Sequence, residues 1–240
     1  MPRRAATTKR ASAPAARRRR NGRAERAAEA VAEVAQAPAP EVRPASGGRR
    51  AEIIAAAAQL FDVGGYHTVS MEDIADAVGI RKPTLYHYFR AKDEILYEIY
   101  LETIDRLLAR QERRGAVPLD PKQELLEIMG DVLEVVETLP GHVRVFFEHH
   151  RELPDERHDE IMAKRERYHE HAVEVIRGGI ADGSLRADLD PQLSALAIFG
   201  ACNWAYQWYV RSGELGGREI AQRFWDLFMR GMLEAPAASA

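Results

Sequence analysis

The sequence predicts an all-α protein of about nine helices, and three observations support this fold class. From Arg49 onward, apolar residues recur at intervals of three and four positions, which is the period of an amphipathic helix. No segment shows the clean alternation of apolar and polar residues that marks a half-buried strand. The chain has 240 residues, 46% of them hydrophobic and 30% charged, which suits one or two globular domains.

Residues 1–48 are expected to form a disordered basic arm. They are rich in Ala, Arg and Pro and contain no aromatic residue, so they cannot bury enough apolar surface to offset the entropy of ordering. The first 50 residues carry 13 Lys and Arg and 4 Asp and Glu, a net charge of +9, which leaves -12 on the remainder. This asymmetry favours nucleic acid first and an anionic membrane surface second as the arm's partner, with an idle solvated tail as the alternative. The arm lacks the apolar run of a secretory signal.

Three helices are expected at the start of this region, of which the second and third are short. One runs from Arg49 and ends at Gly64-Gly65, because glycine is common just after a helix. The next begins at Ser70 as N-cap, with Asp73 three residues later, and ends at Gly79. The third covers Arg81 to Tyr88.

The rest of the periodic pattern predicts six further helices. Prolines and glycines separate them, and Asp190 followed by Pro191 is a typical helix start. We expect these helices at about residues 91–115, 119–139, 142–153, 154–181, 191–211 and 217–233.

The two short helices after Ser70 have the residues of a helix-turn-helix. Helices that cross steeply need a small residue at the contact, here Ala75, and a residue tolerant of positive φ at the turn, here Gly79. The apolar residues expected to point into the joint are Ile74, Val78, Ile80, Leu85 and Tyr88. The third helix opens with cationic and hydroxyl groups that suit phosphates and base edges in a major groove. An ordinary helical hairpin, the alternative, leaves these groups exposed without a purpose.

The run from Thr68 to Leu96, which includes IADAVGIRKPTLYHYF, resembles the signature of TetR-type bacterial repressors. The resemblance implies that Lys82, Pro83 and Thr84 face bases. It implies that Tyr86, His87 and Tyr88 lie against the DNA backbone and that Lys92 binds a phosphate. The full set of DNA-binding residues expected on this basis is Ser70, Arg81, Lys82, Pro83, Thr84, Tyr86, His87, Tyr88 and Lys92. Two positions depart from the family pattern, since Arg81 replaces a small capping residue and Glu72 replaces a basic one.

The same resemblance implies a domain layout and partners. A DNA-binding domain is expected at 49–97, a ligand-binding and dimerisation domain at 98–234 and a disordered tail at 235–240. Family members bind double-stranded operator DNA as homodimers, joined mainly by the last two helices, and respond to a small-molecule inducer. The implied function is therefore a ligand-responsive transcriptional repressor.

Twenty residues without a charge, Pro191 to Val210, contain an unusual aromatic cluster. This stretch is long enough to cross a bilayer, but its Gln, Ser and Asn residues are costly in lipid, so we expect a buried helix and no membrane partner. The cluster, with Trp204 and Trp208, is expected to form an apolar pocket wall with polar handles such as Asn203. Plain packing of a core and dimer seam is the alternative.

Three strings in this half are similar to the regulatory halves of TetR-type repressors of fatty acid and steroid breakdown, which respond to acyl-CoA thioesters. They are FFEHHRE from Phe146, GSLRADLDP from Gly183 and NWAYQWY from Asn203. The resemblance implies a long apolar pocket for an acyl chain, with basic or polar groups near its mouth for the phosphates. The ligand-binding residues expected are Phe146, Phe147, His150, Asn203, Trp204, Gln207 and Trp208. The competing interpretation is a repressor of a drug efflux pump with a promiscuous aromatic pocket.

The sequence gives no reason to expect an enzyme, a metal or a cofactor. It contains no GxSxG, P-loop, Rossmann or HExxH pattern, and His169 and His171 point to different sides of a helix. The single cysteine, Cys202, excludes an intrachain disulfide and suits a reducing cytoplasm. Apart from a repressor, the remaining possibility is a helical interaction protein whose arm binds nucleic acid or anionic lipid without sequence preference.

Overall fold

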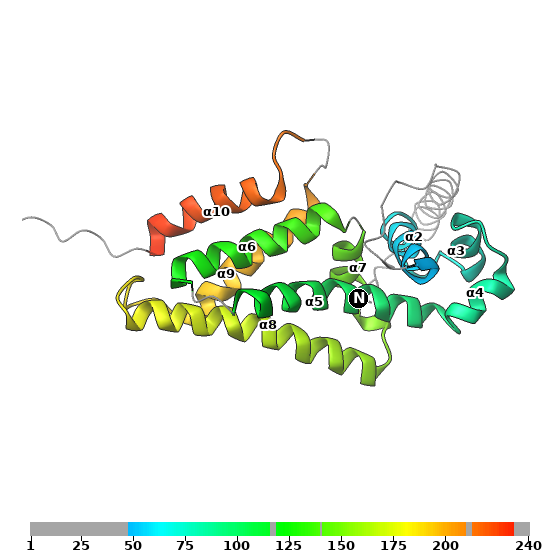
Figure 1. Ribbon diagram of the computed structural model, residues 1–240, viewed down its shortest axis with the longest axis horizontal. Coiled ribbons are helices and arrows are strands. Elements are labelled where there is room, and N and C mark those ends of the chain that lie inside the picture. The colour runs from blue at the N-terminus through cyan, green and yellow to red at the C-terminus, as the bar shows by residue number, and fades with distance from the viewer. Residues whose placement is uncertain (1–47, 116–118, 140, 210–212, 233–240) are drawn as a thin grey trace, which may run out of the picture.

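The computed structural model describes residues 48–115, 119–139, 141–209 and 213–232, which form nine α-helices and no strand. The all-α fold class predicted from the sequence is thereby confirmed. The basic arm up to residue 47, positions 210 and 211 of the expected aromatic helix, residue 233 and the tail at 235–240 lie outside the described residues. Figure 1 shows an elongated molecule with the first three helices at one end and the remaining helices packed together in the rest of it.

The first three helices are α2 (Gly48–Gly64), α3 (Met71–Ala77) and α4 (Lys82–Tyr88), close to the predicted boundaries. One side of α2 is fully buried and supplies the core of this part of the molecule. After α2 the chain reverses at Gly65, whose φ of 80° lies in the left-handed region that favours glycine.

The turn between α3 and α4 has the local geometry that the sequence predicts. Ser70 caps α3: its Oγ accepts a hydrogen bond from the Asp73 backbone N–H at 3.2 Å, and the Asp73 carboxylate accepts one from the Ser70 N–H at 2.7 Å. Gly79 has a φ of 66°. The following N–H, of Ile80, returns to the carbonyl of Ala75 at 3.0 Å, so the turn is closed by a backbone bond at the small residue.

The joint between these helices differs from the prediction at one position. Ile74 and Leu85 are fully buried there, as expected, but Tyr88 is 38% exposed and does not point into the joint. Phe89, the next residue, is fully buried in its place. The chain leaves α4 at Phe89 in an extended conformation, which turns the Phe89 ring inward, and the Arg50 guanidinium covers that ring at 4.2 Å.

The helix α5 (Lys92–Arg114) has 23 residues and belongs to both halves of the molecule. Its N-terminal part packs on α2, and its C-terminal part packs among the long helices (Figure 1). The helix passes residues 97 and 98 without a break, so the domain boundary predicted there remains a prediction.

The next three helices are α6 (Pro121–Thr138), α7 (His142–Glu148) and α8 (Asp155–Ala181). The helix predicted for 142–153 is wrong in its second half, because α7 ends at Glu148 and a 3₁₀ turn, η1 (His150–Glu152), follows. Pro154 disfavours the helical conformation in the residue before it, and the chain is extended there.

The last part of the chain forms α9 (Pro191–Asn203), the 3₁₀ turn η2 (Trp204–Gln207) and α10 (Gly217–Met232). Asp190 caps α9 as predicted, since its carboxylate accepts a hydrogen bond from the Leu193 N–H at 3.0 Å.

The predicted continuation of this helix to about residue 211 is wrong, because α9 ends at Asn203 after 13 residues. The tightened turn that follows lets the Tyr206 ring stack on Phe147 of α7, with ring centroids 5.5 Å apart. No helix in the described part of the chain is long and apolar enough to cross a membrane.

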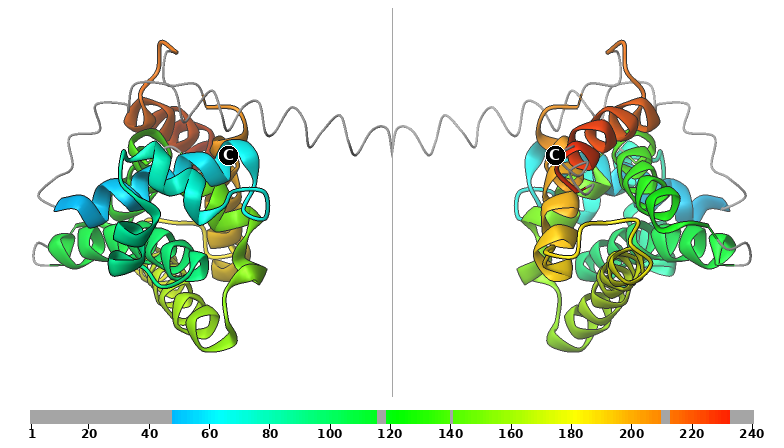
Figure 2. Two further views of the ribbon diagram at one scale, coloured as in Figure 1. Left: turned by 90° about the vertical axis from the view of Figure 1, so that its right-hand side faces the viewer. Right: turned by 90° about the vertical axis from the view of Figure 1, so that its left-hand side faces the viewer.

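Two close contacts fix α10 on α6. A Cβ at Gly217 would lie 2.6 Å from the Leu133 carbonyl oxygen, so only glycine allows this approach. Beside it, the Asp131 carboxylate is 1% exposed and accepts hydrogen bonds from Arg110 and Arg114 of α5 and from Arg218 of α10. These bonds join three helices at one buried charge. The end views in Figure 2 show α10 and α8 on opposite sides of the bundle.

Candidate nucleic-acid interface and ligand cavity

The first half of the candidate site is the outer face of α4 with the turn before it. Only Leu85 of this helix is buried, and it anchors the helix on the core. The exposed residues on this surface are Arg81, Lys82, Pro83, Thr84, Tyr86, His87 and Tyr88. Cationic, hydroxyl and aromatic groups are thereby presented together on one short helix, which is the geometry of a major-groove recognition helix.

Two of the predicted DNA-binding residues already have partners within the protein. The Lys82 ammonium lies 3.2 Å from a Glu72 carboxylate oxygen, and both side chains are exposed. Such a pair contributes about 0 to 1 kcal/mol, so DNA can displace it at little cost. The Ser70 hydroxyl donates a hydrogen bond to the Asp73 carboxylate at 2.7 Å and accepts the α3 cap bond, which leaves it less to offer a phosphate.

Lys92 lies at the first position of α5, where the resemblance places a phosphate contact. Its ammonium donates hydrogen bonds to the Tyr66 carbonyl at 2.5 Å and the Val69 carbonyl at 2.7 Å, and it lies 4.3 Å from the centroid of the Tyr66 ring. Burial lowers the pKa of this ammonium. Lys92 therefore holds the loop between α2 and α3, and one N–H remains for a phosphate.

Arg50 is a residue of this region that sequence reasoning missed. Its guanidinium donates a hydrogen bond to the Tyr88 carbonyl at the end of α4 at 2.9 Å, and it pairs with Glu98 of α5 at 2.5 Å. It thereby fixes the end of the recognition helix to two other helices. Two consecutive arginines at the start of the first helix, Arg49 and Arg50, were the available signal.

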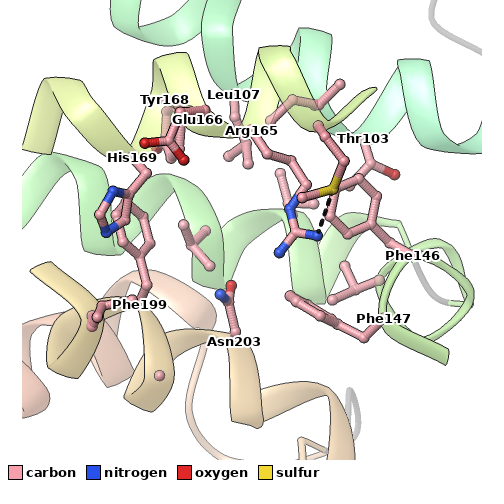
Figure 3. A pocket seen from close by; sticks show the side chains of 17 residues that line it. Thr103, Leu107, Phe146, Phe147, Arg165, Glu166, Tyr168, His169, Phe199 and Asn203 are labelled. Carbon is pink, nitrogen blue, oxygen red and sulfur yellow. Dashed lines mark hydrogen bonds between the residues drawn. The ribbon is translucent and has the colours of Figure 1, made fainter. Parts of the chain in front are cut away.

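The second half of the site is a cavity of about 390 Å³ among α5, α6, α7, α8 and α9 (Figure 3). This volume is near the lower end of the range for ligand sites, about 300 to 1,000 Å³. Most of its wall is apolar. The lining residues are Thr103, Ile104, Leu107, Val132, Val135, Val143, Phe146, Phe147, Met162, Arg165, Glu166, Tyr168, His169, Leu196, Phe199, Gly200 and Asn203.

The cavity includes some of the predicted ligand-binding residues and not others. Phe146, Phe147 and Asn203 line it, whereas His150, Trp204, Gln207 and Trp208 do not. Trp204 is 61% exposed, so the expected aromatic wall is not the wall of this cavity. The reason is the end of α9 at Asn203, beyond which the chain no longer follows the cavity.

Sequence reasoning missed four polar residues of α8 that line the cavity: Arg165, Glu166, Tyr168 and His169. The Tyr168 hydroxyl and the His169 Nε2 are buried atoms without a hydrogen-bond partner among the described residues. Burial raises the pKa of the Tyr168 hydroxyl and lowers that of the Arg165 guanidinium. Figure 3 shows the Arg165 guanidinium on the side of Phe147 and Asn203, and the His169 ring beside Phe199 at the other side. The sequence signal that could have identified these residues was their helical spacing, which places them on one side of an amphipathic helix.

One group on α8 has the chemistry of metal ligands. Glu166, His169 and Glu170 place their ligand-type atoms within 4.8 Å of one another. Glu170 of this group is already paired with Arg177 at 2.8 Å. The expectation of no metal remains a prediction.

The outer face of α9 and the turn η2 after it carry an apolar stripe, here called the α9 stripe. Its members are Leu193, Leu196, Ala197 and Gly200 of α9, Trp204 of η2, and Trp208 directly after η2. All six residues are exposed. On α10, Leu227 is 72% exposed. Large apolar side chains in such a row mark a protein interface, and the small residues allow two helices to approach closely. The expectation that the last two helices form the dimer seam agrees with this surface.

The two halves of the site meet at α7. Arg144 pairs with Asp62 of α2 at 2.5 Å, and a Cβ at Gly141 would lie 2.7 Å from the Ala58 carbonyl oxygen. On its other side α7 presents Phe146 and Phe147 to the cavity. One short helix thus contacts both the cavity and the DNA-binding helices.

These features define a class: a helix-turn-helix DNA-binding protein whose second helical domain holds a ligand cavity and an interface for a second copy. Two family models match the chain. One, described as bacterial regulatory proteins, tetR family, matches residues 53–99, and the other, tetracyclin repressor-like, C-terminal domain, matches residues 118–232. The chain belongs to the TetR family.

Three solved structures illustrate the likeness. The ketosteroid transcriptional regulator KstR2 of Mycobacterium tuberculosis is 26% identical with a TM-score of 0.74, over 79% of this chain and 97% of its own. PfmR from Thermus thermophilus is 32% identical with a TM-score of 0.70, over 76% and 99%. AibR, in complex with isovaleryl coenzyme A and operator DNA, is 26% identical with a TM-score of 0.66, over 75% and 97%. The chain is thus a DNA-binding transcriptional repressor and not an enzyme. It forms a dimer, and it binds a small-molecule ligand.

Proposed function

We propose that this repressor leaves a palindromic operator when an acyl-CoA-type ligand binds, and that it controls lipid or steroid catabolism from the cytoplasm. The observation that carries the proposal is the apolar cavity beside α7. An acyl chain gains about 0.8 kcal/mol per buried CH₂, so such walls favour it. The relatives support the ligand class, since one is described as a ketosteroid regulator and another was solved with isovaleryl coenzyme A.

The contacts of α7 suggest how the ligand acts on DNA. A ligand releases DNA only if it binds better to a conformer whose two recognition helices no longer match the groove. A ligand in the cavity presses on Phe146 and Phe147, and α7 transmits the displacement to α2 through Arg144 and Asp62. A coupling of about 1 to 3 kcal/mol, typical of such switches, is small compared with the burial of an acyl chain.

The test begins with the operator, which is selected as the bound fraction of a random DNA pool. A panel of acyl-CoA thioesters is then titrated against the complex with fluorescently labelled operator. We expect at least one long-chain or polycyclic acyl-CoA to release the DNA. Release by cationic drugs, with indifference to every thioester, would instead support an efflux repressor. The cationic Arg165 in the cavity wall argues against that alternative, because it repels a cationic ligand.

A matched pair of variants locates the ligand. Val135 lines the cavity and is 2% exposed, so Val135→Phe fills part of it. Val63 is 44% exposed on α2, and Val63→Phe makes the same chemical change outside the cavity. We expect the first variant to bind operator normally and to lose release, and the second to retain both. Equal release from both variants would contradict this location.

A further inference from the structure

Arg165 is a cation in an apolar wall without a carboxylate partner among the described residues. Its guanidinium lies 5.1 Å from the centroid of the Phe146 ring and 5.8 Å from that of Phe147. Within the described part of the chain its one hydrogen-bond contact is to the Met162 sulfur at 3.6 Å, and a thioether is a weak acceptor (Figure 3). Other part-buried arginines of the bundle differ, since Arg110 and Arg114 each donate to two carboxylates.

The surroundings of Arg165 orient the guanidinium without neutralising it. The two aromatic rings contact the guanidinium but accept no hydrogen bond from it in the described structure, so most of its N–H donors stay available to a ligand. A guanidinium stays charged at any physiological pH, and a buried charge is costly unless it is paired. The geometry therefore suits a planar, anionic acceptor such as a carboxylate, which binds two N–H groups at once.

The size of the cavity indicates which part of a thioester ligand carries the anionic group that faces Arg165. A volume of about 390 Å³ suits an acyl group, and the nucleotide of coenzyme A lies outside it. The exposed lining residues, which mark the opening, include Glu166, whose carboxylate repels phosphates. Arg165 therefore faces the acyl part of the ligand.

We propose that Arg165 binds a carboxylate carried by the acyl part of the ligand, so that the preferred ligands are acyl compounds with a second, free acid group. This inference rests on the proposed function, because it takes the cavity as the inducer site. It narrows the ligand class from acyl-CoA in general to carboxyl-bearing acyl groups.

Three thioesters of equal chain length test the inference: octanoyl-CoA, suberyl-CoA, which has a carboxylate in place of the terminal methyl, and the methyl ester of suberyl-CoA. Each of them, as well as free suberate and coenzyme A alone, is titrated against the complex of full-length repressor and operator. We expect suberyl-CoA to act at concentrations about tenfold lower, or more, than its methyl ester, as for a charge-assisted hydrogen bond. Arg165→Gln should abolish the preference, and Arg165→Lys should keep part of it. Arg167→Gln is the control, because Arg167 lies on the same helix but is exposed and pairs with Glu112.

Equal potency of suberyl-CoA and its methyl ester on the wild-type protein overturns the inference, as does a preference that survives Arg165→Gln. If octanoyl-CoA releases the operator without any preference for the acid, the proposed function stands and the inference fails. If only free suberate acts, and only with Arg165 present, the inference stands and the thioester proposal fails. Arg165-dependent binding of coenzyme A alone would assign the guanidinium to a phosphate and overturn the inference.

A stability measurement separates ligand binding from a structural role. Because an unpaired, partly buried charge costs free energy, Arg165→Met without ligand should melt at the same temperature as the wild type or higher. A lower melting temperature would show that the guanidinium serves packing, and would overturn the assignment.

Discussion

The double role of Lys92 leads to a sharp prediction for Lys92→Met, which keeps the length of the side chain and removes its charge. The substitution leaves the carbonyls of Tyr66 and Val69 without the two bonds they accept, at 2.5 and 2.7 Å. Hydrogen bonds to charged groups contribute about 1.5 to 3 kcal/mol each. Two effects make the net loss smaller. The substitution removes the cost of burying the ammonium, which is what lowers the Lys92 pKa, and the site is partly exposed to solvent. We therefore expect a net loss of about 2 kcal/mol in the free energy of unfolding.

Chemical denaturation and operator binding at several salt concentrations measure the two roles of Lys92 separately. For a chain of this size, about 2 kcal/mol lowers the melting temperature by about 4 to 8 °C. If the remaining N–H binds phosphate, the salt dependence of log K also falls, by about 0.9 per contact. Lys82→Met is the control, because the exposed pair with Glu72 should change the stability by at most about 1 kcal/mol. A Lys92→Met protein of wild-type stability would refute the argument that the ammonium supports the loop.

Three further predictions concern the recognition helix, the interface and the buried charges. Thr84→Ala should change base preference within a half-site, at about 1 to 3 kcal/mol per lost contact in competition binding, and unchanged preference would remove Thr84 from the readout. Leu193→Glu places a charge on a residue that is 65% exposed in the α9 stripe, and light scattering should find a folded monomer; a dimer would locate the seam elsewhere. The Arg110 hydrogen bond lowers the pKa of Glu134 from 4.5 to about 2. The stability that this pair contributes is present above pH 4.5 and is lost as the pH falls towards about 2. Glu134→Gln should therefore make the plot of unfolding free energy against pH flatter in that range, and an unchanged slope would contradict the prediction.

The DNA-binding half was predictable because its signals are local. Ser70 with Asp73, and Gly79 at the turn, act over a few residues, so the cap and the turn appear where the sequence indicates them. Tyr88 and Phe89 were the exception. Which of two adjacent aromatic residues enters the core depends on the backbone after α4, and no periodicity specifies that.

The cavity was less predictable because its wall comes from five helices. The aromatic cluster indicated a large apolar surface, and the structure places Trp204 on the outside of the molecule. Aromatic content does not say which side of a helix faces a cavity, or that α9 ends at Asn203. Arg165 is one charged residue among many on α8, and only its missing carboxylate partner distinguishes it.

Leu196 and Gly200 belong both to the cavity wall and to the exposed α9 stripe, so an inducer in the proposed cavity site and a second protomer on the predicted seam would share part of their binding surface. By mass action, two equilibria that share a surface depend on each other, and each changes the other by the same factor. The concentration of inducer that gives half-maximal release is therefore not a constant of the molecule. It varies with the amount of repressor in the cell, and titrations at nanomolar and micromolar protein should give different midpoints even after correction for ligand depletion.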